Sequence, residues 1–249
     1  MKKHDDTITV YWSPSAFTKD ETNWNFLYSD PVSALADLNT IRNKSAKNMF
    51  TCPAYTQSMK NVFVFKSSLT EKIKLDNDFF VPKGNHPFYH YGKSKILLTE
   101  LRESSLDQHV NVSYNMGWLF FADQPVEARF TAPYFPTTSP APGAMLATGQ
   151  FNIGEWYRDY ILDYHIPFGT KELNFEKDQP LFYLELRTDK KVIFKRYNLT
   201  RELKRVAEEC STSPGNYEAS KSLLYRYNVF KRSSSPERVL SYIKDNLIK

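Results

Sequence analysis

Long hydrophobic runs are missing from this sequence. The longest uncharged apolar stretches are residues 62–65 and 118–122, whereas a membrane-spanning helix requires about 18 consecutive apolar residues. The mean hydropathy of −0.54 agrees with a chain that does not enter a bilayer. The basic start of the chain continues into Asp5 and Asp6 instead of the apolar segment of a signal peptide. The sequence therefore predicts a protein without membrane contact that is made and kept in a cytoplasm.

Cysteine and glycine are also scarce. Cys52 and Cys210 lie far apart in a chain of 249 residues, which is long enough to bury a core without a disulfide framework, so both are interpreted as free thiols. Only 8 glycines exclude a collagen-like chain, and 41% hydrophobic residues exclude a wholly disordered one. The 18 Phe, 16 Tyr and 4 Trp predict a core of large flat side chains, which favours sheets over helix bundles.

A strong excess of one charge sign is absent from most of the chain. Residues 1–188 carry 19 Lys and Arg against 21 Asp and Glu, a net charge of −2, whereas residues 189–249 carry 14 against 7, a net charge of +7. Such an asymmetry can mark a surface for nucleic acid or for another acidic partner. The alternative, which we favour, is that short helices in a small appendage expose solvated lysines.

Short apolar runs bounded by polar or turn residues predict about ten β-strands. The predicted strands are residues 7–12, 62–66, 72–75, 109–114, 118–122, 128–131, 145–151, 160–166, 180–187 and 191–197. This pattern indicates a mainly β fold, an antiparallel barrel or a jelly-roll-like sandwich, in one β-rich domain over residues 1–198. The expected core includes Trp12, Val62, Val64, Trp118, Phe120, Ile161, Leu181, Leu184 and Ile193.

Two hairpins are predicted within the β-rich domain. Residues 115–117 lie between the runs 109–114 and 118–122, and Gly117 can adopt the positive φ that a tight turn needs. Residues 187–190 join the next such pair of apolar runs in the same manner. In each case we expect the two flanking strands to pair with each other.

Helical signals lie near the N-terminus and at the C-terminus. Ser29-Asp30-Pro31 supplies a cap and a first-turn proline, and apolar residues then recur every three positions from Val32 to Ile41. This pattern predicts one early helix. At the other end, three short helices are predicted at residues 200–210, 217–230 and 235–248.

The three C-terminal helices define a small basic helical extension, residues 199–249. Helices of about a dozen residues are marginal in water without tertiary packing, so they must pack on each other and on the β-rich domain or a second subunit. The apolar residues expected to be buried are Leu203, Val206, Leu223, Leu224, Val239 and Ile243. The basic residues expected to form an exposed surface are Arg201, Lys204, Arg205, Lys231 and Arg232.

Motifs with a specific catalytic meaning are absent too. His86 and His90 have a His-x3-His spacing, but Pro87 and two flanking glycines place them in a loop, where the spacing has no geometric meaning. Neither the His-x-acid pattern of iron oxygenases in the body of the chain, nor Gly-x-Ser-x-Gly, nor a phosphate-binding glycine loop is found. We therefore predict no cofactor. His86, His90 and His165 are the metal candidates for an alternative in which the chain is an enzyme with a cupin-like site at a barrel mouth.

Two other groups of residues are candidate sites. Glu155, Asp159 and Asp163 recur every four residues, but the surrounding run is β-prone, so they are interpreted as solvated or ion-paired surface acids. Exposed aromatic side chains make large contacts at low entropic cost. The aromatic loops are therefore predicted to contact a partner protein through Phe88, Tyr89, Tyr91, Tyr134 and Phe135.

Several aromatic and proline motifs occur together in this chain. They include Val10-Tyr11-Trp12, Phe50-Thr51-Cys52-Pro53-Ala54, Ile166-Pro167-Phe168 and Phe175-Glu176-Lys177-Asp178-Gln179-Pro180. Over residues 8–197 the chain resembles a group of uncharacterised proteins encoded by tailed bacteriophages, and more distantly a bacterial family of unknown function with the same Pro-Phe and Phe-x-Lys-x-x-Pro pattern. The resemblance brings no catalytic residues. It implies an origin in a phage genome and a role in the virion or in the infected cell.

Together these observations predict a non-enzymatic protein that acts through protein–protein contact, in the virion or the host cytoplasm. It would be a virion component or a factor that binds a host or phage protein, with a partner protein or self-association expected. Two alternatives stay open. One is the enzyme described above, and the other is nucleic-acid binding through the basic C-terminal helices, where Tyr225 and Tyr227 would stack on bases.

Overall fold

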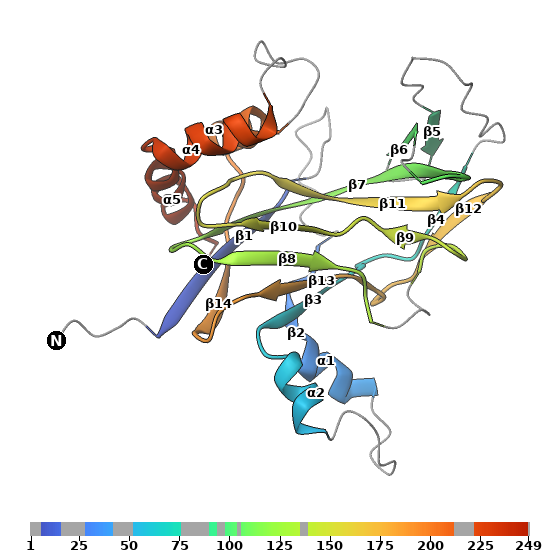
Figure 1. Cartoon of the computed structure of the whole chain (residues 1–249), viewed down its shortest axis with the longest axis horizontal. Coiled ribbons are helices and arrows are strands. Elements are labelled where there is room, and N and C mark those ends of the chain that lie inside the picture. The colour runs from blue at the N-terminus through green and yellow to red at the C-terminus, as the bar shows by residue number, and fades with distance from the viewer. Residues whose placement is uncertain are drawn as a thin grey trace.

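The computed structural model of the chain describes residues 6–15, 28–41, 52–75, 90–93, 98–103, 106–134, 139–211 and 222–248. Within these ranges most of the regular structure is β-strand, arranged in two sheets and accompanied by five helices. Figure 1 shows the sheets as two layers, with one group of helices at each side of the pair. The predicted mainly β class is therefore confirmed.

The larger sheet has nine strands in the order β12-β4-β5-β6-β7-β1-β14, and β11 pairs with both β7 and β9. Its strands are β1 (Thr7–Pro14), β4 (Glu71–Lys74), β5 (His90–Lys93), β6 (Leu98–Glu103), β7 (His109–Ala122), β9 (Met145–Leu146), β11 (Asp159–Pro167), β12 (Glu172–Phe175) and β14 (Lys191–Arg196). The long strand β7 organises this sheet, because β6 and β1 follow one another along one of its edges and β11 runs along the other.

The smaller sheet has five strands in the order β10-β8-β13-β3-β2. Its strands are β2 (Val32–Ser33), β3 (Val62–Lys66), β8 (Glu127–Thr131), β10 (Gly149–Asn152) and β13 (Pro180–Leu186). In the part of the chain that is described, neither strand order closes on itself, so the sheets are open and no closed barrel is found.

Aromatic side chains hold the two sheets face to face. The ring of Phe65 on β3 lies edge-on to that of Trp118 on β7, with centroids 6.2 Å apart, and Trp118 lies 4.9 Å from Phe182 on β13. Phe130 on β8 stacks on Tyr160 of β11 at 3.9 Å. Since each ring comes from one sheet and contacts the other, the predicted core of large flat side chains is the layer between the sheets.

Most of the predicted core residues are buried. Trp12, Val62, Val64, Trp118, Phe120, Leu181 and Leu184 are each at most 1% exposed. Ile161 is only half-buried, and the prediction for Ile193 is wrong, since it is 39% exposed. Strand β14 packs Val192 and Phe194 against the core, so the two-residue period of the strand turns Ile193 to the outer face.

The first predicted hairpin is wrong. Residues 115–117 continue straight through β7, and the irregularity falls instead on β11, where the pairing register shifts between Ile161 and Leu162. Glycine is needed at position 117 because the Ser15 side chain approaches this backbone closely, and not because the chain turns there. A Cβ at Gly117 would lie 2.3 Å from the Oγ of Ser15.

The second predicted hairpin is also wrong, although the turn itself exists. Strand β13 pairs with β3 and β8 in the smaller sheet, whereas β14 pairs in parallel with β1 in the larger sheet. The turn at residues 187–190 therefore carries the chain from one sheet to the other. Which strands pair depends on the strand order of the whole fold, and the residues of the turn do not determine it.

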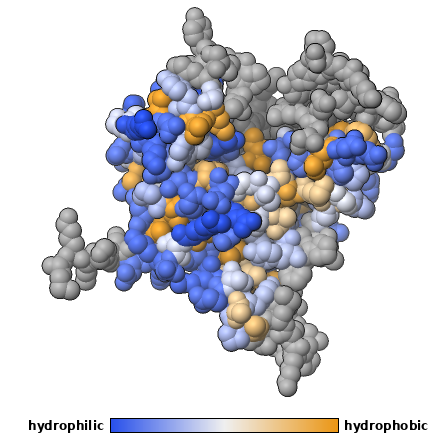
Figure 2. Space-filling model, in the orientation of Figure 1, coloured by the Kyte–Doolittle hydropathy of each residue, from blue (hydrophilic) through white to orange (hydrophobic). Residues whose placement is uncertain are grey.

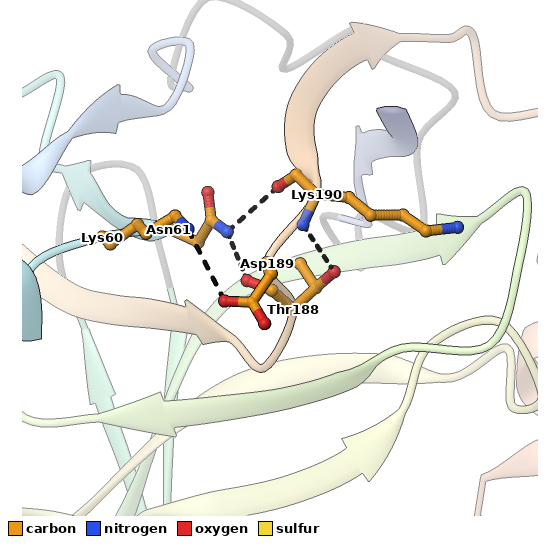
Figure 3. Close-up of polar contacts among 5 residues, drawn as sticks. All are labelled: Lys60, Asn61, Thr188, Asp189 and Lys190. Atoms are coloured by element: carbon orange, nitrogen blue, oxygen red, sulfur yellow. Dashed lines mark hydrogen bonds and ion pairs between the residues drawn. The ribbon is translucent and has the colours of Figure 1, made fainter. Parts of the chain in front are cut away.

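Asn61 holds this crossing turn in place. Its Nδ2 donates to the carbonyl oxygens of Thr188 (2.6 Å) and Lys190 (3.1 Å), and Lys60 pairs with Asp189 at 3.5 Å (Figure 3). Asn61 has a φ of 56°, a left-handed conformation that asparagine tolerates better than most residues. The side chain thus ties the start of β3 to the connection between the sheets.

Replacing Asn61 should measurably loosen the fold. Asn61→Gly keeps the positive φ but loses both side-chain bonds, and we expect it to lower the free energy of unfolding by about 1–2 kcal/mol. Asn61→Ala should lose about 1 kcal/mol more because alanine disfavours this φ. Urea denaturation measures both values. Lys60→Ala, which removes only an exposed ion pair, is the control and should change little. Parental stability in both Asn61 variants would contradict this role.

The first group of helices lies against the smaller sheet. α1 (Ala34–Ile41) buries Ala34 and Leu38 against Val64 of β3. The predicted early helix is confirmed as α1, although it begins at Ala34 because Val32 and Ser33 form β2. α2 (Pro53–Ser58) is a second short helix that the sequence analysis did not predict. Pro53 lies in the first turn of α2, where its fixed φ favours the start of a helix. This proline is the sequence signal that could have predicted α2.

The second group of helices confirms the predicted helical character of the C-terminal part. Its members are α3 (Arg201–Cys210), α4 (Leu223–Arg232) and α5 (Ser235–Asp245). The side chains of Thr200 and Ser222 cap α3 and α4 by accepting from the backbone N–H groups of Leu203 and Tyr225. Figure 1 places all three helices on the side of the larger sheet away from the smaller one.

Candidate functional site

The helical extension packs on the outer face of the larger sheet. The sheet side of this contact consists of Tyr11, Leu119 and Phe121, together with Trp156 and Tyr157 just before β11. The helix side consists of Leu203, Ala207, Cys210, Phe230, Val239 and Ile243. The ring of Trp156 lies edge-on to Tyr227 at 5.3 Å and to Phe230 at 5.8 Å. The chain's own sheet thus provides the packing that the short helices need.

Polar contacts surround this apolar contact. Glu155 Oε2 accepts from the Tyr227 hydroxyl at 2.9 Å and pairs with Lys231 Nζ at 2.7 Å. At the end of the chain, the backbone N–H of Ile248 donates to the carbonyl of Arg196 at 3.0 Å. Glu155 is therefore an ion-paired surface acid, as predicted.

Two of the residues predicted to be buried in the extension are not. Leu203, Val239 and Ile243 are at most 1% exposed, but Leu223 is 37% and Leu224 is 68% exposed. Helix α4 turns Arg226 and Phe230 toward the contact. Leu223 lies in the first turn, and Leu224 is displaced from Phe230 around the helix by more than a quarter of a turn. The apolar stripe of the sequence is therefore wider than the buried face.

An acidic side chain is buried beneath α3. Asp159, the first residue of β11, is 7% exposed, and Ser15, directly after β1, is 5% exposed. Ser15 Oγ and Asp159 Oδ1 are both buried without a well-oriented hydrogen-bond partner, although the Ser15 hydroxyl lies close enough to the carboxyl group to lower its pKa. Ser15 fits there because of the missing side chain at Gly117. The interpretation of Asp159 as a surface acid is wrong, because α3 covers this end of the sheet.

Burial changes the acidity of Asp159. Loss of hydration disfavours the carboxylate and raises the pKa of Asp159 to about 7. Ser15 and the guanidinium of Arg158 act in the opposite direction. From α3, Glu208 raises this pKa further and Lys204 lowers it. The carboxyl group therefore keeps its proton to a higher pH than a solvated aspartate does.

The groups around Asp159 are mostly neutral. The hydroxyl groups of Tyr157 and Tyr197 hydrogen-bond to each other at 2.8 Å, and burial raises the pKa of both phenols. Cys210 on α3 is 4% exposed, and burial raises the pKa of its thiol to about 12. Asp159 thus lies beside neutral phenols and a neutral thiol, while its own pKa is raised to about 7.

The space next to Asp159 is small. The cavity there has a volume of about 10 Å³, close to the space of one water molecule, and is lined by Ser15, Leu119, Asp159, Leu199, Lys204, Ala207 and Glu208. Small-molecule sites usually offer about 300–1,000 Å³. A near-neutral carboxyl group can serve as a general acid or base, but this pocket has little room for a substrate. Asp159 is therefore better placed to take up and release a proton than to act on a bound substrate.

A row of polar side chains lies on the same outer face, farther along β7 and β11. Ser113, which is 4% exposed, donates to Asp163, and the Oδ1 of Asn111 is buried without a hydrogen-bond partner. His165 is the cross-strand neighbour of Asn111. Asp163 is therefore hydrogen-bonded within the sheet, and of the three histidine candidates His165 is the one whose side chain the structure describes.

The other predicted metal and aromatic residues fall largely outside the described ranges. His86, Phe88, Tyr89 and Phe135 all lie there. His90 and Tyr91 belong to β5, where their Cα partners are Leu101 and Glu100 of β6. Tyr134 is 44% exposed, and its ring packs edge-on against Tyr183 at 4.5 Å. The aromatic contact surface therefore stays a prediction.

The predicted basic surface is interrupted by acids. Arg201, Arg205, Lys231 and Arg232 are exposed, whereas Lys204 is half-buried beside the pocket of Asp159. Arg205 pairs with Glu209 at 3.6 Å, and Lys231 pairs with Glu155. Since α3 also carries Glu202 and Glu208, its basic residues do not form an unbroken stripe.

Among the described residues, no group of three His, Cys, Asp or Glu side chains could hold a metal ion, and no helix is long and apolar enough to span a membrane. Comparison with known proteins gave no match to a family model, to a curated protein or to a solved structure. The resemblance to phage proteins stays a prediction.

Proposed function

We propose that this chain is a binding protein that acts through protein–protein contact, with the outward face of α4 as the contact surface. The observation that carries the proposal is the exposure of apolar side chains on a helix that is already docked. Leu224 is 68% and Val229 51% exposed, while Arg226 and Phe230 form the docked face of the same helix. Val229 adjoins Tyr225, which is four residues earlier on the helix and 48% exposed, and exposed apolar side chains that adjoin are typical of contact surfaces.

The partner of this face is an acidic protein segment with apolar side chains. The face carries Arg232 next to its apolar residues, and α4 contains no Asp or Glu. Residues 189–249 have a net charge of +7, which favours encounter with an acidic surface. Figure 2 shows hydrophobic and strongly hydrophilic residues side by side over the helical extension, at the upper left. Nucleic acid fits less well because acids alternate with the basic residues of α3.

The setting of this activity is the virion or the host cytoplasm, where the chain is a virion component or a factor that binds a host or phage protein. This setting rests on the resemblance to tailed-phage proteins that the sequence analysis predicts for residues 8–197. The two packed sheets support a jelly-roll-like sandwich as the rigid scaffold that presents the helical extension.

A displayed library of short random peptides tests the proposed surface. Selection on the purified full chain should enrich peptides that combine Asp or Glu with aliphatic or aromatic residues. The double variant Leu224→Glu/Val229→Glu should weaken their binding by about 30-fold, which corresponds to the roughly 2 kcal/mol of a contact hot spot. Fluorescence anisotropy measures the dissociation constants.

Phe168→Glu is the matched control for this experiment. Phe168 is 51% exposed, as Val229 is, but lies in the turn after β11, so its replacement should leave peptide binding unchanged. Far-ultraviolet circular dichroism verifies that each variant is folded. The proposal fails if the selected peptides share no acidic and apolar character, or if their binding survives the α4 double variant. It fails equally if the α4 face binds single-stranded DNA in preference to the peptides.

A further inference from the structure

The junction between α3 and the larger sheet buries a titratable group, the carboxyl group of Asp159, one oxygen of which lacks a well-oriented hydrogen-bond partner. Ser15 Oγ and Asp159 Oδ1 are buried there without well-oriented hydrogen-bond partners, and α3 closes over them with Ala207, Lys204 and Glu208. An unsatisfied buried polar group costs free energy, and a buried charge costs much more. Asp159 therefore weakens this contact to a degree that depends on its charge.

We propose that this junction is a proton-controlled latch, in which the extension stays docked while Asp159 is protonated and α3 loosens from the sheet when the proton is lost. The contact lies within the chain, so the latch does not depend on the partner proposed above. It would allow a change of pH near neutrality to alter how firmly the extension is held.

The surroundings of Asp159 explain why its carboxylate is poorly tolerated. Arg158 precedes it on the chain, and its Nε donates to the backbone oxygen of Asp159 and not to the carboxylate. Lys204 and Glu208 face the pocket from α3 with opposite charges. The phenols that complete the surroundings, which come from Tyr28, Tyr157 and Tyr197, are neutral. In the described part of the chain, no side chain forms an ion pair with Asp159.

The direction of the effect follows from proton linkage. Docking raises the pKa of Asp159 to about 7, whereas a solvated aspartate titrates near 3.9. Between these values the docked state holds a proton that the undocked state has released. Raising the pH through this window therefore favours undocking, by up to about tenfold per pH unit. Above the docked-state pKa both states are ionised, so the effect levels off.

The two free cysteines make this opening measurable. Cys210 lies buried in α3, whereas Cys52 is exposed. A maleimide label reacts with Cys210 only when α3 opens, and Cys52 reports the intrinsic pH dependence of the thiol reaction in the same sample. Peptide mass spectrometry gives both rates. The ratio of the Cys210 rate to the Cys52 rate should rise by up to about tenfold per pH unit between pH 5 and about 7, and then level off.

Variants of the charged groups identify the origin of this rise. Asp159→Asn should make the ratio independent of pH, whereas Asp163→Asn, on the same strand and face, should leave the rise intact. Glu208→Gln removes a charge that raises the pKa of Asp159, so it should move the rise to lower pH. A flat ratio in the unmodified chain, or an unchanged rise in Asp159→Asn, would overturn the latch. If Asp159→Asn does not fold, an unshifted profile in Glu208→Gln would overturn it.

Discussion

Removal of residues 199–249 should leave a protein that precipitates or melts more than about 10 °C below the full chain. Truncation uncovers Tyr11, Leu119, Phe121, Trp156 and Tyr157 on the sheet, each of which is at most 4% exposed in the full chain. Since burial of one large apolar side chain contributes about 1.5–3 kcal/mol, the loss is expected to exceed about 5 kcal/mol. That is comparable with the entire stability of many domains.

Thermal unfolding and light scattering measure this effect. Phe230→Ala in the full chain is the milder version, and its expected cost is about 3 kcal/mol because the ring packs against Trp156. Leu224→Ala on the same helix is the control and should change stability by less than about 0.5 kcal/mol, since this side chain is 68% exposed. If the truncated protein kept the melting temperature and the oligomeric state of the full chain, the packing of the extension on the larger sheet would not contribute to stability.

Trp118→Ala should lower the free energy of unfolding by about 3–5 kcal/mol. Trp118 is 1% exposed and lies between the sheets, with its ring 5.2 Å from Tyr28 and 4.9 Å from Phe182. Loss of the indole side chain would leave a cavity that these rigid neighbours cannot close without repacking. Urea denaturation followed by circular dichroism gives the value.

The matched control for Trp118→Ala is Tyr242→Ala. Tyr242 is 38% exposed on α5, so the loss of its aromatic ring should have a small effect. Trp118→Phe should lie between the two, because it keeps an aromatic ring in the layer between the sheets. If Trp118→Ala unfolded at the urea concentration of the parent, the aromatic layer would not be the core.

The sequence predicts those features that depend on neighbouring residues. Alternation along 160–166 and 191–197 located β11 and β14, and Pro236 marked the start of α5. Pairing between distant strands is not encoded locally. Gly117 and the turn at 187–190 have the composition of hairpin turns, yet one lies within a straight strand and the other connects two sheets.

The candidate site was beyond sequence analysis for the same reason. Ser15 and Asp159 are far apart in the sequence, and they meet only because β1 and β11 lie on opposite edges of β7. Asp159 does follow the aromatic pair Trp156-Tyr157 and precedes Tyr160, a context unusual for a surface acid. That context was a usable signal of burial, but it could not indicate that α3 provides the cover.

Nuclear Overhauser spectroscopy on the full chain tests most directly whether the extension docks on the sheet of its own chain, on which the contact surface and the latch both depend. The centroids of the Trp156 and Phe230 rings are 5.8 Å apart, so a chain with labelled tryptophan and phenylalanine should give cross-peaks between these two rings, which are told apart from the tryptophan–phenylalanine contacts of the core by their loss in Phe230→Leu. A mixture of singly labelled chains should give none. Absence of cross-peaks in the doubly labelled chain, or their presence in the mixture, would contradict docking within one chain.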